Sequence, residues 1–164
     1  MKRKNKIDWY FHNTSKFIVD VCLNNEINTI IIGYNKEWKD EINLGKQTNQ
    51  NFVSIPFSRL IRQLQYKAKL AGINIALQEE SYTSKASFLD NDFIPTYKNE
   101  ETEYVFSGKR IKRGLYLSKD KIQLNADING SLNIMRKYLN VASNSIIGER
   151  SRGLIVSPIL VNFS

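Results

Sequence analysis

Asp127 is the residue with the clearest potential for chemistry, because it lies where a short apolar run gives way to helical spacing. After it, apolar side chains recur at intervals of four and three on one face of a predicted helix, at Ile128, Leu132, Met135 and Leu139. A carboxylate at a helix start either caps the helix by accepting a backbone N–H or binds a metal ion at a sheet edge. In the second interpretation, the amides of Asn129 and Asn133 line the approach to the metal.

A second acidic position, Glu79 and Glu80, ends a predicted strand. The strand follows a predicted helix over 55–72, and a β-branched run over 27–33 precedes that helix. This strand, helix, strand order predicts two parallel strands whose carboxyl ends meet at one edge of a sheet. Glu79 and Glu80 are then either an exposed acidic pair or ligands at that edge, close to Gly33 at the end of the first strand.

Two amphipathic helices are predicted to support this unit. The first covers 7–25, and on it Cys22 is most simply a small buried residue. In the second, over 55–72, Pro56 suits the first helical turn and Gly72 suits the left-handed position just past the end.

Composition limits the class of protein. The chain has 164 residues, 41% of them hydrophobic, which is enough for one modest core, and its net charge of +8 favours a polyanionic partner. The single cysteine, Cys22, excludes an intrachain disulfide and a cysteine-cluster zinc site, and it fits a reducing compartment. No run approaches 18 apolar residues, so the sequence predicts neither a membrane span nor a signal peptide.

The densest basic cluster lies over 108–114. It contains Lys109, Arg110, Lys112 and Arg113, and the aromatic residues near it are Tyr104, Phe106 and Tyr116. Lysine and arginine beside aromatic rings can hold phosphates and stack on bases, and a solvated hairpin is the alternative interpretation. The residues over 116–122 resemble a strand and a turn that lead back to Asp127.

Four stretches, taken together and in order, resemble one known family. The run from Asn125 to Ile134, Asn-Ala-Asp-Ile-Asn-Gly-Ser-Leu-Asn-Ile, resembles the third RuvC motif of the TnpB (OrfB) proteins, which insertion sequences encode beside their transposases. Three further stretches that match in the same order are 49–57, 66–73 and 80–85.

The resemblance implies an incomplete RNase H-like (RuvC-type) α/β domain over 1–139, with a tail over 140–164. Members of this family are magnesium-dependent, RNA-guided DNA endonucleases, so the resemblance implies DNA and a guide RNA as partners in transposition. Most members carry a four-cysteine zinc ribbon, whereas residues 86–108 here contain no cysteine. We therefore expect a zinc-free replacement in that segment, packed through Phe88, Leu89, Phe93, Ile94 and Tyr97.

The resemblance also assigns roles to individual residues. Asp127 and Glu80 are implied as magnesium ligands, with Glu79 as the second choice, because Gly33 occupies the position of the family's usual glutamate. Lys85 and Asn129, together with the basic cluster, are implied as nucleic-acid contacts.

The family's first RuvC motif, which bears the remaining catalytic aspartate, does not occur in the sequence. We therefore expect the C-terminal part of a cytoplasmic, nucleoid-associated nuclease, inactive without the N-terminal half. The alternative is a nuclease-dead nucleic-acid-binding remnant or regulator.

Overall fold

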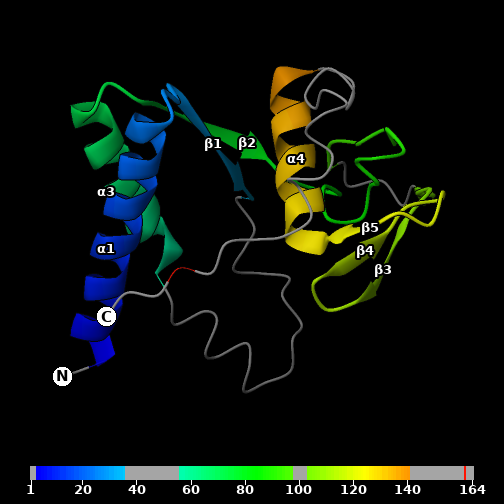
Figure 1. Ribbon diagram of the computed structural model, residues 1–164, viewed down its shortest axis with the longest axis horizontal. Helices are drawn as coiled ribbons and strands as arrows, with labels where there is room; N and C mark the ends of the chain where they lie inside the picture. The colour runs from blue at the N-terminus through cyan, green and yellow to red at the C-terminus, as the bar shows by residue number, and fades with distance from the viewer. Residues whose placement is uncertain (1–2, 36–55, 98–102, 141–160, 162–164) are drawn as a thin grey trace. The chain divides into compact units, whose positions relative to one another are not determined.

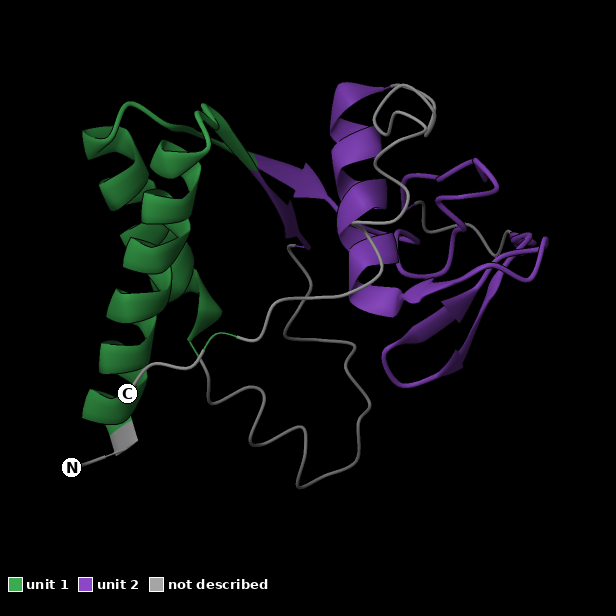
Figure 2. Cartoon of the chain, viewed as in Figure 1, with its two compact units in different colours: residues 1–30, 36–76, 161–164 green, residues 31–35, 77–160 purple. Residues whose placement is uncertain are grey.

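The computed structural model describes residues 3–35, 56–97, 103–140 and 161 (Figure 1). Helices and strands alternate along the chain at first and are followed by three short strands and a final helix. The chain divides into two compact units, one comprising 1–30, 36–76 and 161–164 and the other comprising 31–35 and 77–160 (Figure 2). The described residues include no helix long and apolar enough to cross a membrane.

The first unit is built on two helices, α1 (Arg3–Asn24) and α3 (Phe57–Leu70), which lie side by side (Figure 1). Their buried apolar side chains recur at helical spacing, at Phe11, Val19, Cys22, Leu64 and Ala68, and the polar Ser15 is buried with them. Polar contacts join the same two helices, because Arg59 pairs with Asp8 and the Lys67 ammonium donates to the Ser15 hydroxyl at 2.8 Å. Both predicted helices are thus confirmed, and so is the burial of Cys22.

The ends of α3 follow from its sequence with one adjustment. Pro56 lies at the N-cap position rather than within the first turn, and no side chain caps the helix there. Gly72, beyond the C-terminal end, has a φ of +73°, which is the left-handed conformation that the sequence predicts at this position.

Strands β1 (Thr29–Tyr34) and β2 (Asn74–Glu79) pair as a parallel two-stranded sheet. Helix α3 lies between them in the chain. The Asn74 amide donates to the Asn28 carbonyl at 2.8 Å where the pair begins. At the other end of the pair, Gly33 lies in β1 and Glu79 is the last residue of β2. The predicted parallel unit is therefore present, and it delivers the two glutamates to its carboxyl edge.

The second unit contains an antiparallel sheet of β3 (Lys109–Lys112), β4 (Leu115–Leu117) and β5 (Gln123–Asn125), in that order. Tyr116 lies opposite Arg110 on one side and Leu124 on the other. Helix α4 (Ala126–Leu139) follows β5 without a connecting residue. Tyr116, Leu124 and Ala126 form the buried core here, with Leu89 packed against it.

The segment that follows Lys85 differs partly from the prediction. Phe88 is buried and Leu89 packs on the core, but Phe93 and Tyr97 are exposed, so the proposed apolar packing through those two is wrong. Hydrogen bonds hold this part of the segment instead. The Asp92 carboxylate accepts from the backbone amides of Ser87 at 2.8 Å and Ser107 at 3.0 Å.

Candidate functional site

Glu80 and Gly33 meet at the carboxyl edge of the parallel strand pair. A Cβ atom built on Gly33 would clash with Oε2 of Glu80, would lie 2.6 Å from Cδ1 of Ile134 and would be 3.3 Å from Cβ of Glu80. The carboxylate of Glu80 therefore fills the space that a side chain at position 33 would enter. Gly33 leaves this space open because it has no side chain.

Glu79, the second choice for this role, is held by other groups. Lys137 of α4 forms an ion pair with its carboxylate, and the Ser81 amide donates to Oε1 at 2.7 Å. Burial alone would raise the pKa of Glu79, but the contacts with Lys137 and Ser81 outweigh it and lower that pKa below its usual value. The geometry thus gives Glu79 the role of fastening β2 to α4.

Asp127 lies in the first turn of α4, but it does not cap the helix. Asn125 is the N-cap residue, and its Oδ1 accepts from the amides of Asp127 at 2.8 Å and Ile128 at 3.1 Å. The capping interpretation of Asp127 is therefore wrong, because the residue two positions earlier already provides the acceptor. The Asp127 side chain is 86% exposed and lies 3.6 Å from the Arg110 guanidinium.

Helix α4 carries Asp127 in its first turn and approaches Glu80 further along its length, at Ile134. Ile134, whose side chain lies against the Gly33 position, follows Asp127 by seven residues, which corresponds to about 10 Å along the helix axis. Both residues occupy the same helix face because seven residues complete two turns. Asp127 thus lies about two turns of α4 before the helix residue that packs at the Gly33 position.

The amides of Asn129 and Asn133 do not line an approach to a metal. Asn129 is fully buried, accepts from the Phe88 amide at 3.0 Å and donates to the Ala86 carbonyl at 2.8 Å. Asn133 is also fully buried and donates to the carbonyls of Thr83 and Ala86. Asn129 therefore has no surface to offer a nucleic acid, and the correction is that both amides fasten the 83–88 segment onto α4.

The basic cluster forms the antiparallel hairpin of β3 and β4. Every residue of β3 is exposed, and Arg113 lies exposed in the turn that follows. Lys85 is exposed on a separate turn, with its ammonium 5.9 Å from the centre of the Tyr82 ring. These cations are therefore exposed, which both the phosphate-binding and the solvated-hairpin interpretations predict.

Tyr116 behaves differently from the other aromatic residues near that cluster. It is fully buried, and its hydroxyl donates to the Lys85 carbonyl at 2.7 Å. Burial, together with the nearby charge of Asp92, raises the pKa of Tyr116 to about 12. Tyr116 is a core residue and cannot stack on a base.

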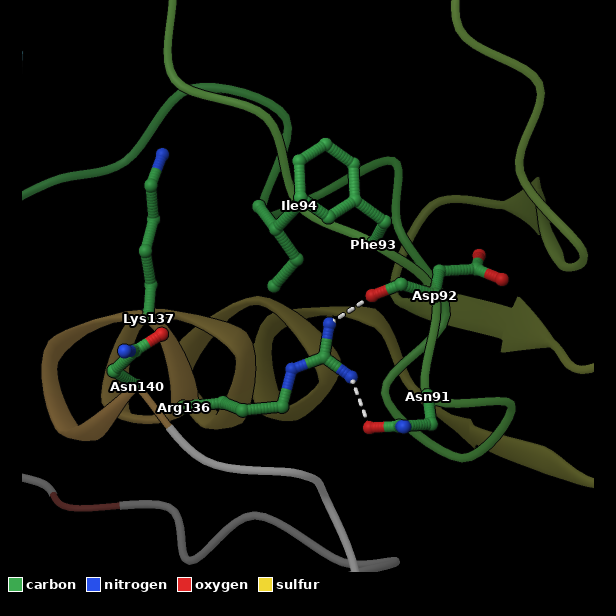
Figure 3. Close-up of a pocket in the computed structure, with 7 residues that line it drawn as sticks. All are labelled: Asn91, Asp92, Phe93, Ile94, Arg136, Lys137 and Asn140. Atoms are coloured by element: carbon green, nitrogen blue, oxygen red, sulfur yellow. Dashed lines mark hydrogen bonds between the residues drawn. The ribbon is translucent and has the colours of Figure 1, made fainter.

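A pocket of about 370 Å³ lies beside the C-terminal half of α4 (Figure 3). Arg136 crosses its floor and donates to Asn91 Oδ1 at 3.0 Å and to the Asp92 carbonyl, while Lys137 reaches the Pro95 carbonyl at 3.0 Å. Burial lowers the pKa of Arg136, an effect that the charge of Asp92 partly offsets. Because both cations are bonded to the 91–95 segment, this pocket is part of the packing of that segment on α4.

The candidate metal ligands of the site are carboxylate oxygens, which suit a hard cation, but only two residues supply them among the described residues. Carboxylate oxygens are the ligands that magnesium prefers, and Glu80 and Asp127 supply them. Within the described ranges, no three histidine, cysteine, aspartate or glutamate residues gather closely enough to hold a metal ion. The described residues therefore fit a contribution to a magnesium site rather than a complete one.

Sequence reasoning missed four positions that the structure brings into the site. Arg136 and Lys137 carry no motif, and only the bonded geometry shows that they hold the loop segments against α4. Tyr82 has a φ of +63°, which a sequence cannot reveal for a residue other than glycine. Asn125 was detectable, because asparagine is among the preferred N-cap residues.

Comparison with known proteins supports this reading of the fold. Residues 57–134, which include Glu80 and Asp127, match the family model described as Cas12f1-like, TNB domain. A solved structure described as the cryo-EM structure of the Cas12f1-sgRNA-target DNA complex is similar over 81% of this chain, with 18% identity and a TM-score of 0.54. This chain spans about a third (34%) of that chain. No curated protein matches.

The structural similarity bears on the fold. It confirms the predicted mixed α/β fold, with a parallel strand pair and flanking helices.

Proposed function

We propose that this chain is the C-terminal part of a TnpB-type, RNA-guided DNA endonuclease encoded by an insertion sequence and acting in the cytoplasm at the nucleoid. The observation that carries the proposal is the Glu80 carboxylate lying over Gly33 at the end of the parallel strands. The family match of residues 57–134 and the fold similarity to Cas12f1, whose structure holds a guide RNA and target DNA, support it.

In this proposal, Glu80 and Asp127 are ligands of catalytic magnesium. Bound magnesium would polarise the scissile phosphodiester and activate the attacking water. Glu80 is suited to the role because Gly33 leaves room for its carboxylate at the carboxyl edge of the strands. The remaining ligand would come from the N-terminal half that carries the first RuvC motif.

Arg110 would hold Asp127 in place before the metal binds. The two side chains lie 3.6 Å apart, and the pair is exposed, at 50% for Arg110, so its net contribution to stability is small. A nucleic-acid phosphate would compete for Arg110 and release the carboxylate. Arg110 thus links the binding of the substrate strand to the availability of Asp127.

The exposed cations of the β3–β4 hairpin would contact the nucleic-acid backbone. Lys109, Lys112 and Arg113 join Arg110 in this surface, and Lys85 lies on a separate turn. Each phosphate contact that releases a counterion makes binding more salt-dependent. The contacts would position DNA or RNA without reading its sequence.

A second candidate function is a nucleic-acid-binding remnant or regulator without nuclease activity. The observation that favours it is the absence of a three-carboxylate group among residues 3–35, 56–97, 103–140 and 161. It shares the basic surface with the first proposal and differs only in the chemistry at Glu80 and Asp127.

The test is cleavage of single-stranded and double-stranded DNA with magnesium, by the chain alone and mixed with an N-terminal half that bears the first RuvC motif. We expect cleavage only in the mixture, and its loss in Asp127→Ala and Glu80→Gln. The matched control is Asp120→Asn, which alters an exposed carboxylate in the turn between β4 and β5. Cleavage that survives both variants would contradict the assignment of Glu80 and Asp127 as metal ligands. Binding without cleavage in every mixture would favour the remnant.

A further inference from the structure

Three aromatic rings gather at the surface of the second unit. Tyr82 makes an edge contact with Tyr104, at 5.1 Å between ring centres, and lies 6.2 Å from Phe106 at an angle of 37°. All three rings are partly exposed. Val105, between the two partners of Tyr82, is 94% exposed, because neighbouring side chains of an extended segment point to opposite sides.

Tyr82 is held at this surface by a backbone conformation that is unfavourable for it. Its φ of +63° lies in the left-handed region, where a bulky side chain is an outlier. Its carbonyl accepts from the amides of Lys85 at 3.0 Å and Ala86 at 2.9 Å, and Thr83 bonds to the Glu80 carbonyl on the other side. The surrounding turn therefore fixes the ring, and conformations of this kind concentrate at functional positions.

One cation lies over the cluster of Tyr82, Tyr104 and Phe106, and others follow it closely in the sequence. The Lys85 ammonium lies 5.9 Å from the centre of the Tyr82 ring, and the exposed strand β3 begins three residues after Phe106. Aromatic faces beside a row of cations are the features that proteins use to bind single-stranded nucleic acid, whose unpaired bases stack while its phosphates pair with the cations. A duplex cannot offer its base faces in this way.

We propose that Tyr82, Tyr104 and Phe106 form a stacking platform for a base of single-stranded nucleic acid. This inference rests on the nucleic-acid binding of the proposed function and adds a residue-level contact to it. Tyr82 is two positions after Glu80 in the same turn. The platform would favour binding of an unpaired strand over a duplex.

The experiment measures binding in the absence of metal, by fluorescence anisotropy, of a labelled 15-nucleotide thymidine oligomer, the same backbone carrying abasic sites, a duplex and a single-stranded RNA. Four proteins are compared with the unaltered chain: Tyr82→Asn, Tyr82→Gly, Tyr66→Asn and the double change Lys109→Gln, Arg110→Gln. Asparagine and glycine tolerate a positive φ, so these changes remove the ring without adding backbone strain. Tyr66 is an exposed tyrosine of α3 outside the cluster and serves as the matched control.

We expect Tyr82→Asn to weaken binding of the thymidine oligomer by about tenfold, and to leave binding of the abasic oligomer unchanged. The Lys109, Arg110 variant should weaken both oligomers equally. Equal affinity of the Tyr82 variants and the unaltered chain for the thymidine oligomer would overturn the platform alone. Failure of the unaltered chain to bind any of the four nucleic acids would overturn the proposed function as well. The RNA arm shows which type of strand the platform accepts.

Discussion

The carboxylate of Glu80 lies where the side chain of residue 33 would begin, so a side chain added at position 33 would displace that carboxylate. Gly33 in β1 leaves a space without a side chain, and Glu80, directly after β2, fills that space with its carboxylate. This relationship has direct experimental consequences.

Gly33→Ala should disturb the edge. The added methyl group would meet the flexible ends of Glu80 and Ile134, which must both move, and overpacking of this kind typically costs about 1–3 kcal/mol of unfolding free energy. Urea unfolding measures the change. Gly130→Ala is the matched control, because a Cβ there meets nothing within 4 Å and should stabilise α4 by up to about 1 kcal/mol. Equal effects of the two substitutions would contradict the packing described here.

Moving the carboxylate between the two positions should preserve metal binding. Glu80→Ala should weaken binding of Mn²⁺, used as a magnesium substitute and followed by electron paramagnetic resonance. The combined change Gly33→Glu and Glu80→Ala should restore much of it, because the two side chains share one space. A double variant that binds no better than Glu80→Ala would show that the two positions are not equivalent.

The contribution of the N-cap residue Asn125 to stability can be measured separately from that of Asp127. Asn125→Ala removes the acceptor for two amides and should cost about 1 kcal/mol of stability, whereas Asp127→Asn should cost less, since Asp127 only approaches Arg110 at the surface. Thermal unfolding of the two variants at one pH makes the comparison. A larger loss for Asp127→Asn would mean that the carboxylate stabilises the helix more than the cap does.

Asn129→Ala should be severely destabilising. The change leaves the Phe88 amide without its acceptor and removes a donor from the Ala86 carbonyl, both in a fully buried place, and each unsatisfied group costs about 1–3 kcal/mol. Hydrogen exchange should show faster exchange at the Phe88 amide specifically. Ser131→Ala, on the exposed side of the same helix, is the control. Unchanged protection of Phe88 would contradict the bond.

The ion pair of Glu79 with Lys137 should make the fold sensitive to acid. The pKa of Glu79 is lowered in the folded chain, so the unfolded chain binds more protons between the two pKa values and stability falls with decreasing pH there. The loss should begin below about pH 4.3, the usual glutamate value, and continue through the lower folded value. Urea midpoints at pH 7 and 3.5 should differ less for Glu79→Gln than for the unaltered chain. An identical pH dependence would exclude Glu79 as a source.

The sequence predicts the elements well because their signals are local. The helices over 7–25 and 55–72 have apolar stripes, and the strand that delivers Glu79 and Glu80 has clear alternation, so α1, α3 and β2 appear where periodicity places them. The predicted left-handed position at Gly72 is present for the same reason.

The interpretation of polar residues was less successful, because polar groups in a folded chain are distributed by long-range partners. Asn129 has the same sequence signature whether it faces a ligand or a buried carbonyl, and only the contact with 86–88 decides. Phe93 was expected in a core and is 78% exposed, since hydrogen bonds to Asp92 and Arg136 determine the path of its segment. The assignments of Glu80, Asp127 and the basic cluster to nuclease chemistry stay predictions.

The Ala86 carbonyl accepts from two asparagines one helical turn apart, Asn129 and Asn133, each at 2.8 Å. A single carbonyl can meet both donors only at one register of the 83–88 segment against α4. Oδ1 of Asn133 is buried and accepts no hydrogen bond among the described residues, so this side chain holds the 83–88 segment only through the hydrogen bonds that it donates. An inserted or deleted residue between Glu80 and Phe88 would therefore break both bonds together. Length variation in related chains should be rare in this short interval, even where substitutions accumulate.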